Sequence, residues 1–257
     1  MATIIEHEVK NRTMWITFRE ESERRPCTLD FGVLDQLEKT MDAVEATEGL
    51  RSVVIRAASE KYFVVGANIE ALQKLTPEGI EEWIRRGHKT FNRLANLALP
   101  VIACVAGAAM GGGLELATAC DYIVAGENAR FAQPEAGLGF IMGWGGTYRL
   151  PKLVGPGLAK HMYFTGKVLT AREAHAAGLV VEVVPADTLQ KRMEEIVDAI
   201  GRNAALGIRL TKEVINAHIF DRAELAVQFE AANSVACLHS PETTRRMEEF
   251  FASRAKK

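Results

Sequence analysis

The amino-acid sequence predicts an α/β fold in which neighbouring strands pair in parallel. Short β-branched runs alternate with amphipathic stretches over much of the chain, and this alternation is typical of strand–helix–strand units. Hydrophobic residues make up 48% of the 257 residues, which is enough for one sizeable core. From about residue 157 the chain is predicted to be mostly helical, as a separate layer or as an oligomerisation element.

The first expected elements are two strands and a long helix. The strands are expected at about 3–9 and 12–18. A helix is expected within 29–47, because apolar residues recur there at three- and four-residue steps. Asp30 is placed to cap this helix. The recurring apolar residues are Phe31, Leu34, Leu37, Met41 and Val44.

The middle of the chain continues the alternation. Buried strands are expected at 51–58 (RSVVIRAA) and 100–107 (PVIACVAG), with a helix between them at about 77–98. Strands follow in DYIVAG and ARFA, ahead of a second glycine-rich loop. Near the C-terminus, the segment HSPETTRRMEEFF has the pattern of a helix start, with Ser240 as the cap. No internal repeat is visible in the sequence.

Composition and charge argue against several classes of protein. The net charge is −2, so no basic surplus favours nucleic acid. The cysteines form no Cys-x-x-Cys pair and none lies near a histidine at a metal-ligand spacing, which argues against zinc sites and a disulfide framework. They are Cys27, Cys104, Cys120 and Cys237. The N-terminus has no targeting pattern, and no apolar run approaches the ~20 residues of a membrane span. We expect a soluble cytoplasmic protein without a bound metal.

The segment GAAMGGGLEL (107–116) has the shape of a ligand-binding turn, since three glycines precede a helical run. A Walker A loop needs Lys-Ser/Thr after its second glycine, but Gly113 and Leu114 follow Gly112. In the second glycine-rich loop, Met142 stands where a dinucleotide-binding fingerprint needs its third glycine. Neither loop contains a serine, and the Gly-x-Ser-x-Gly elbow of the hydrolases is absent from the sequence.

Backbone chemistry remains as an explanation for the glycine triplet, Gly111, Gly112 and Gly113. Glycines let the chain approach a ligand closely, and the N–H groups at a helix N-terminus are unpaired and favour negative charge. An enolate formed from a thioester is such a charge. Tight packing of the helix on a strand would explain the same glycines equally well.

Two glutamates flank these glycine-rich turns. Glu115 lies in an otherwise apolar stretch, where a buried carboxylate is costly, and Glu135 follows Pro134. Each could simply be a first-turn residue that complements the helix dipole. Together they form an acid–base hypothesis.

These residues resemble the crotonase superfamily, and the enoyl-CoA hydratases within it. The resemblance is strongest over 101–150, and it continues in 165–185 and in RRMEEFFASR near the C-terminus. It implies a spiral of ββα units over 1–195, followed by a helical trimerisation region over 196–257. It also implies an acyl-CoA substrate, a homotrimer or homohexamer, and no cofactor beyond the coenzyme A of the substrate.

The resemblance also assigns roles to residues. The backbone N–H groups of Val65 and Gly112 are expected to form the oxyanion hole. Glu115 is expected to deprotonate a water molecule, and Glu135 to supply the proton to the α-carbon of a trans-2-enoyl thioester. The expected substrate-binding residues are Val65, Gly66, Ala67, Asn68, Gly112 and Gly143.

Several positions depart from the usual pattern of the family. Val65 replaces alanine, Asn68 replaces aspartate, Met142 replaces proline and Trp144 replaces a small residue, so the acyl pocket is expected to differ. Arg24 or Arg25 could meet the phosphates of coenzyme A, or could be a solvated pair.

The same resemblance leaves two other functions open. A 3-enoyl-CoA to 2-enoyl-CoA isomerase needs only one glutamate. A non-catalytic relative that binds coenzyme A or RNA needs neither.

Overall fold

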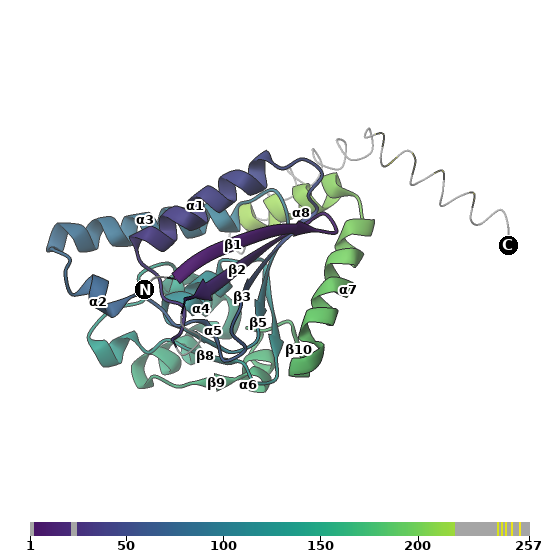
Figure 1. Ribbon diagram of the computed structural model, residues 1–257. Coiled ribbons are helices and arrows are strands. Elements are labelled where there is room, and N and C mark those ends of the chain that lie inside the picture. The colour runs from purple at the N-terminus through teal and green to yellow at the C-terminus, as the bar shows by residue number, and fades with distance from the viewer. Residues whose placement is uncertain are drawn as a thin grey trace.

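The computed structural model describes residues 3–21 and 25–218 and five positions near the C-terminus, and the cap expected at Ser240 lies outside the described residues. The described residues form two β-sheets with helices packed around them (Figure 1). The five C-terminal positions are 241, 243, 245, 248 and 252.

The larger sheet confirms the expected parallel pairing. Its strand order is β1-β2-β3-β5-β7-β10, and every neighbouring pair except the antiparallel β1–β2 hairpin is parallel. The bounds are β1 Thr3–Lys10, β2 Thr13–Glu20, β3 Ser52–Ala57, β5 Val101–Val105, β7 Tyr122–Gly126 and β10 Glu182–Val184.

A smaller sheet makes the fold a spiral. Consecutive strands alternate between the two sheets, so that β3, β5 and β7 enter the larger one and β4, β6 and β8 the smaller one. Each such pair of strands leads into helical structure, which is the ββα spiral that the resemblance implied. The bounds are β4 Tyr62–Val64, β6 Ala108–Met110, β8 Arg130–Ala132 and β9 Leu169–Thr170.

The helices mostly begin and end near the predicted positions. The side chain of Asp30 accepts a hydrogen bond from the N–H of Val33 at 2.9 Å, which confirms the predicted cap. The bounds are α1 Phe31–Ala46, α2 Ile69–Leu72, α3 Pro77–Ala95, α4 Gly112–Thr118, α5 Gly146–Thr165, α6 Ala171–Ala176, α7 Leu189–Arg202 and α8 Ala205–His218, with 3-10 turns η1 Glu135–Leu138 and η2 Ala186–Thr188.

The prediction that the chain is mostly helical from about residue 157 is confirmed for residues 157–218, and two features add to it. Helix α5 already begins at Gly146, and it carries a kink at Gly155 beside Pro156, which interrupts the helical pattern. In addition, β10 adds a parallel strand to the larger sheet beside β7. The β-branched residues of β10 therefore belong to the larger sheet and not to a helical layer.

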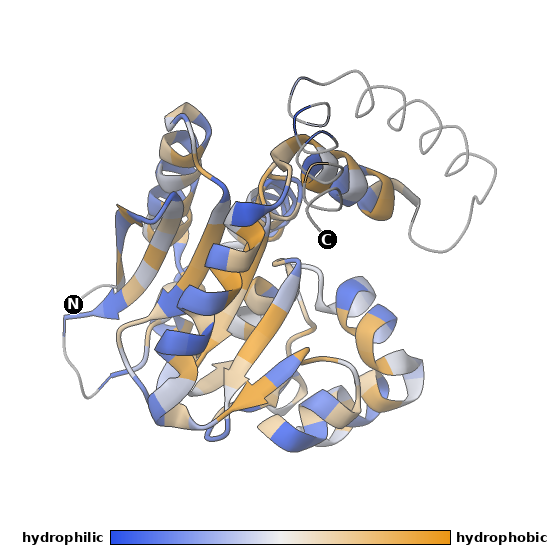
Figure 2. Cartoon of the chain, turned by 90° about the vertical axis from the view of Figure 1, so that its right-hand side faces the viewer, coloured by the Kyte–Doolittle hydropathy of each residue, from blue (hydrophilic) through white to orange (hydrophobic). Residues whose placement is uncertain are grey.

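The larger sheet is covered on both faces. Alternate side chains of β3 point in opposite directions, so Val53 joins the main core while Val54 packs with Leu189 and Met193 of α7. Figure 1 shows α7 alongside this sheet, and Figure 2 shows strongly hydrophobic strands between helices of mixed polarity. The expected domain division at residue 195 falls within α7.

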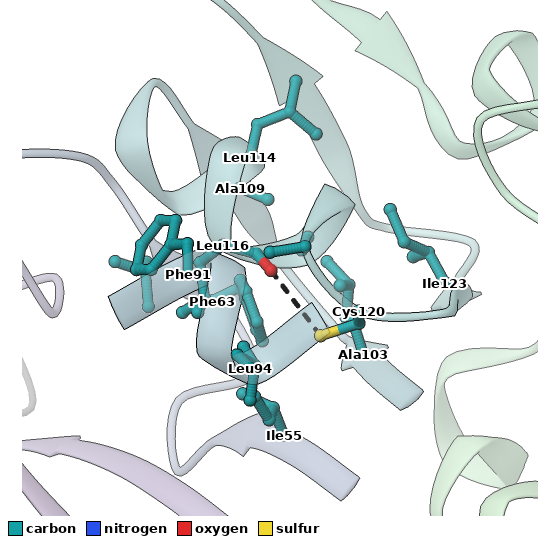
Figure 3. Close-up of a cluster of buried hydrophobic side chains, with 14 of the residues drawn as sticks. Ile55, Phe63, Phe91, Leu94, Ala103, Ala109, Leu114, Leu116, Cys120 and Ile123 are labelled. Carbon is teal, nitrogen blue, oxygen red and sulfur yellow. Dashed lines mark hydrogen bonds between the residues drawn. The ribbon is translucent and has the colours of Figure 1, made fainter. Parts of the chain in front are cut away.

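Helix α4 lies inside the core and fixes the position of the glycine triplet. All seven of its residues are buried, and Figure 3 shows Leu114 and Leu116 among apolar side chains from several elements. The Cys120 thiol donates to the Leu116 carbonyl at 3.5 Å. Among the described residues, no helix is long and apolar enough to cross a membrane.

The contact between α4 and β4 gives the first prediction. A Cβ added to Gly113 would lie 1.9 Å from the carbonyl oxygen of Val64, whereas one added to Gly137 would meet nothing within 4 Å. Overpacking of this kind typically lowers stability by about 1–3 kcal/mol. Gly113→Ala should therefore lower the free energy of unfolding by about 1 kcal/mol or more. Urea denaturation measures the change, with Gly137→Ala as the control. Equal stability of the two variants would contradict the tight contact.

Candidate active site

A cavity of about 180 Å³ opens at the N-terminus of α4. It lies where the end of β4, the start of α4 and η1 come together, which is the arrangement that the spiral creates. Seven of the eight predicted site residues line it: Val65, Gly66, Ala67, Gly112, Glu115, Glu135 and Gly143.

The eighth predicted residue, Asn68, has a structural role beside the cavity. Its Oδ1 accepts a hydrogen bond from the N–H of Ala71 at 3.1 Å and thereby caps α2. Asparagine and aspartate are about equally good caps. The departure from aspartate at this position therefore leaves the local structure intact.

The three consecutive glycines have three different roles. Gly111 has a φ of +53°, a conformation that favours glycine, and a Cβ there would lie 3.0 Å from Glu135 Oε1. Gly112 lines the cavity, and Gly113 packs against the backbone of Val64. The packing interpretation therefore applies to Gly113, and Gly112 stays the expected oxyanion donor.

Glu115 is buried and held by the start of the next helix. Only 2% of the residue is exposed, and its Oε1 accepts hydrogen bonds from the N–H groups of Trp144 and Gly146, both at 2.7 Å. Burial raises the pKa of this carboxyl group, while these two N–H groups and that of Gly143 oppose the rise by stabilising the charged form. The side chain thus lines the cavity with its Oε1 held by the loop that starts α5.

Glu135 faces the same cavity from η1. Its pKa is raised to about 7, mainly because burial removes water from the carboxylate and also because Glu115 is negatively charged nearby. Gln133, which is fully buried, donates from its side-chain nitrogen to Oε1 at 2.8 Å and Oε2 at 3.1 Å in the amide orientation that satisfies its neighbours, and these bonds oppose the rise in the pKa. A carboxyl group with this pKa is poised to exchange a proton near neutral pH.

The two predicted oxyanion donors differ in this structure. Gly112 is the first residue of α4, so its N–H has no acceptor within the helix, and it makes no hydrogen bond to another of the described residues. The N–H of Val65 donates to the carbonyl of Cys27 at 3.0 Å. Gly66 follows Val65 in the chain and has a φ of +97°. A Cβ added to Gly66 would lie 3.6 Å from the backbone nitrogen of Gly112.

Sequence reasoning missed two residues that support the site. Gln133 is one, and Arg149 is the other: its guanidinium donates to the carbonyl of Trp144 at 2.9 Å and to Asn92 at 2.6 Å. Arg149 thereby holds the loop whose N–H groups bind Glu115. An arginine one turn into a helix and a glutamine before Pro134 carry no signal of these roles in the sequence.

The structure describes one member of the arginine pair that could meet the phosphates of coenzyme A. Arg25 is exposed, and Arg24 lies outside the described residues. Within the described ranges, no group of three or more His, Cys, Asp or Glu side chains could hold a metal ion.

The family model described as enoyl-CoA hydratase/isomerase matches residues 11–256. The chain belongs to this family. Its two glutamates and its α4 glycines lie within the matched range.

Relatives within the enoyl-CoA hydratase/isomerase family match almost the full chain. A crotonyl-CoA hydratase from Syntrophomonas wolfei is 35% identical, over 98% of this chain and 95% of its own. A short-chain-enoyl-CoA hydratase from Clostridium acetobutylicum is 38% identical, over 88% and 87%. The crystal structure of an enoyl-CoA hydratase from Bacillus anthracis superposes with a TM-score of 0.90 at 31% identity, covering 98% of this chain and 96% of that one.

The raised pKa of Glu135 predicts a pH-dependent stability. Since the folded state holds its proton more tightly than the unfolded state, this stabilisation is fully present below about pH 4.5 and is lost as the pH rises through about 7. Glu135→Gln removes the titration. Between pH 5 and pH 8, the free energy of unfolding of the wild type should therefore fall by about 2–3 kcal/mol relative to that of Glu135→Gln.

Urea denaturation of both proteins at the two pH values measures this difference. Glu127→Gln, at an exposed turn position, is the control and should follow the wild type. A constant difference between wild type and Glu135→Gln would show that Glu135 has an ordinary pKa.

Proposed function

We propose that the protein adds water to a short-chain trans-2-enoyl-CoA, with Glu115 as the base and Glu135 as the acid. The observation that carries this proposal is the pair of carboxyl groups facing one cavity at the N-terminus of α4. Family membership makes the protein an enzyme of the enoyl-CoA hydratase type. The names of two relatives, a crotonyl-CoA and a short-chain-enoyl-CoA hydratase, support a short acyl chain.

The thioester carbonyl binds at the start of α4 in this mechanism. The N–H of Gly112 donates to the carbonyl oxygen, where negative charge develops as the enolate forms. The N–H of Val65 becomes the second donor by exchanging its hydrogen bond with the Cys27 carbonyl for one with the thioester oxygen. Each such donor is typically worth about 10²–10³ in rate.

The carboxyl groups then divide the proton transfers. Glu115 accepts a proton from water as the water oxygen bonds to the β-carbon, because three backbone N–H groups stabilise its charged form. Glu135, with its pKa near 7, donates a proton to the α-carbon as the enolate collapses. The result is the 3-hydroxyacyl-CoA, and transfer of the proton from Glu115 to Glu135 restores the starting state.

The cofactor requirement, the cellular compartment and the oligomeric state are part of the same proposal. The reaction needs no cofactor beyond the coenzyme A of the substrate. The described cysteines are free and buried, which suits a reducing cytoplasm. A homotrimer or homohexamer assembled through 196–257 remains the expected state, and light scattering measures it.

Removing either carboxylate tests the roles. Glu115→Gln and Glu135→Gln should each lower kcat for crotonyl-CoA by about 10²–10⁴, because that is the range of general acid–base catalysis. The loss of ultraviolet absorbance of the conjugated thioester measures the rate. Glu127→Gln should keep the wild-type rate, since Glu127 lies at an exposed turn.

Near-normal turnover by either glutamine variant would refute the assigned role. Activity on a 3-enoyl-CoA that survives in Glu115→Gln, with no hydration by the wild type, would identify an isomerase instead.

The pKa of Glu135 also predicts the pH profile. The reaction needs Glu135 protonated, so kcat/KM should fall as the pH rises through about 7 and approach a tenfold loss per pH unit above it. On the acid side, kcat/KM should fall as Glu115 becomes protonated. Steady-state kinetics from pH 5 to pH 9 measure both limbs, and a flat profile between pH 6 and pH 9 would contradict the acid role.

A further inference from the structure

A tryptophan forms one wall of the active-site cavity. Trp144 lines the cavity although only 2% of it is exposed. Its backbone N–H binds Glu115, and its indole lies along helix α3. The side chain and the backbone of this residue thus contribute separately to the site.

The indole is locked against one face of α3. Trp83, Gly87 and Phe91 follow each other at four-residue steps, so they share a face of that helix. Trp144 Nε1 donates to the Trp83 carbonyl at 3.1 Å. Its ring centroid lies 4.6 Å from that of Trp83 and 5.3 Å from that of Phe91. The position of the indole is therefore defined on several sides.

Gly87 provides the space for the indole. A Cβ at this position would lie 2.1 Å from Trp144 Nε1, a distance that no side chain can accept without displacing the ring. The glycine in the middle of α3 costs helix stability, and its contact with Trp144 explains why it is there. Trp144 and Gly87 form a matched pair.

The other edge of the indole approaches the reacting atoms. Cε3 and Cζ3 of Trp144 lie 3.5 Å from the would-be Cβ of Gly112, the proposed oxyanion donor. A substrate whose carbonyl oxygen binds Gly112 N and whose double bond lies between the two glutamates must therefore extend its acyl chain toward this wall.

We propose that Trp144, seated on Gly87, limits the acyl chain of the substrate to about four carbons. The cavity of about 180 Å³ must hold the thioester carbonyl, the double bond and the attacking water as well as the rest of the acyl chain. This inference rests on the proposed function, because it uses the position of the thioester at Gly112.

Chain-length selectivity tests the inference. One methylene group in a hydrophobic pocket is worth about 10–200-fold in discrimination. Wild type should therefore favour crotonyl-CoA over trans-2-octenoyl-CoA by at least about 10-fold in kcat/KM. Trp144→Ala, which keeps the backbone N–H to Glu115, should raise the octenoyl-to-crotonyl ratio by at least about 10-fold. Trp144→Leu should shift the ratio in the same direction and guards against poor folding of the alanine variant.

Phe91 supplies the matched control. It packs edge-on against Trp144 and is fully buried, but it does not line the cavity. Phe91→Leu loosens the same aromatic cluster, and its octenoyl-to-crotonyl ratio should equal that of the wild type. A ratio that rises equally in Phe91→Leu would assign the selectivity to general loosening and overturn the inference.

Binding of saturated thioesters separates this inference from the proposed function. Calorimetry with butanoyl-CoA and octanoyl-CoA requires no turnover, and wild type should bind butanoyl-CoA at least about 10-fold more tightly. That preference without any hydration of enoyl-CoA would refute the proposed function and keep the chain-length limit. Equal binding of both thioesters, or a preference unchanged in the Trp144 variants, would overturn the limit.

The pairing with Gly87 has its own test. Gly87→Ala should push the indole into the cavity and weaken butanoyl-CoA binding by at least about 10-fold. The double variant Gly87→Ala/Trp144→Ala removes the collision and should recover the binding of Trp144→Ala. Unchanged binding by Gly87→Ala alone would show that Trp144 is not seated on Gly87.

Discussion

The hydrogen bonds from the N–H groups of Trp144 and Gly146 to Glu115 hold the two halves of the active site together. Glu115 belongs to α4, inside the core, and its two donors lie in the loop that starts α5. A buried carboxylate without such partners would be too costly to keep. The bonds therefore fix the direction of the Glu115 side chain, and they partly offset the rise in its pKa that burial causes.

The spiral supplies the frame for this interaction. Because successive strands alternate between the two sheets, the ends of β4, β6 and β8 lie side by side in the smaller sheet, and the segments that follow them meet at one place. The turn after β4 brings Val65 and Gly66, the turn after β6 brings Gly112, and the turn after β8 brings Glu135. The three turns thus line one cavity, although they are about 20 to 50 positions apart from one turn to the next.

Much of this could be predicted from the sequence, and the failures have identifiable causes. Strand runs and the cap at Asp30 depend on local patterns, and both were confirmed. The start of α5 was missed because it lies at two glycines, Gly145 and Gly146, without a capping side chain. The structural repeat left no sequence signal, since each turn of the spiral has helical segments of different length.

The roles of the site residues could also be predicted only in part. Resemblance identified the glutamates, but it could not show that Gly113 packs on Val64 while Gly112 faces the cavity. Local spacing could not distinguish these roles, because they depend on which side of α4 the strand β4 lies. The hydrogen bond between Val65 N–H and the Cys27 carbonyl is equally a product of tertiary structure, since the two segments are distant in sequence.

The backbone and the side chain of Trp144 have separate roles in the site. Its N–H orients Glu115, and any residue except proline provides that N–H. Its side chain forms one wall of the cavity, and only a side chain that fits the space above Gly87 can take the same position. A change of side chain can therefore alter the acyl pocket while the donor to Glu115 remains. For this reason the reaction and the chain length of its substrate can vary separately on the same loop, and a small residue at this position, as is usual in the family, is compatible with the same chemistry.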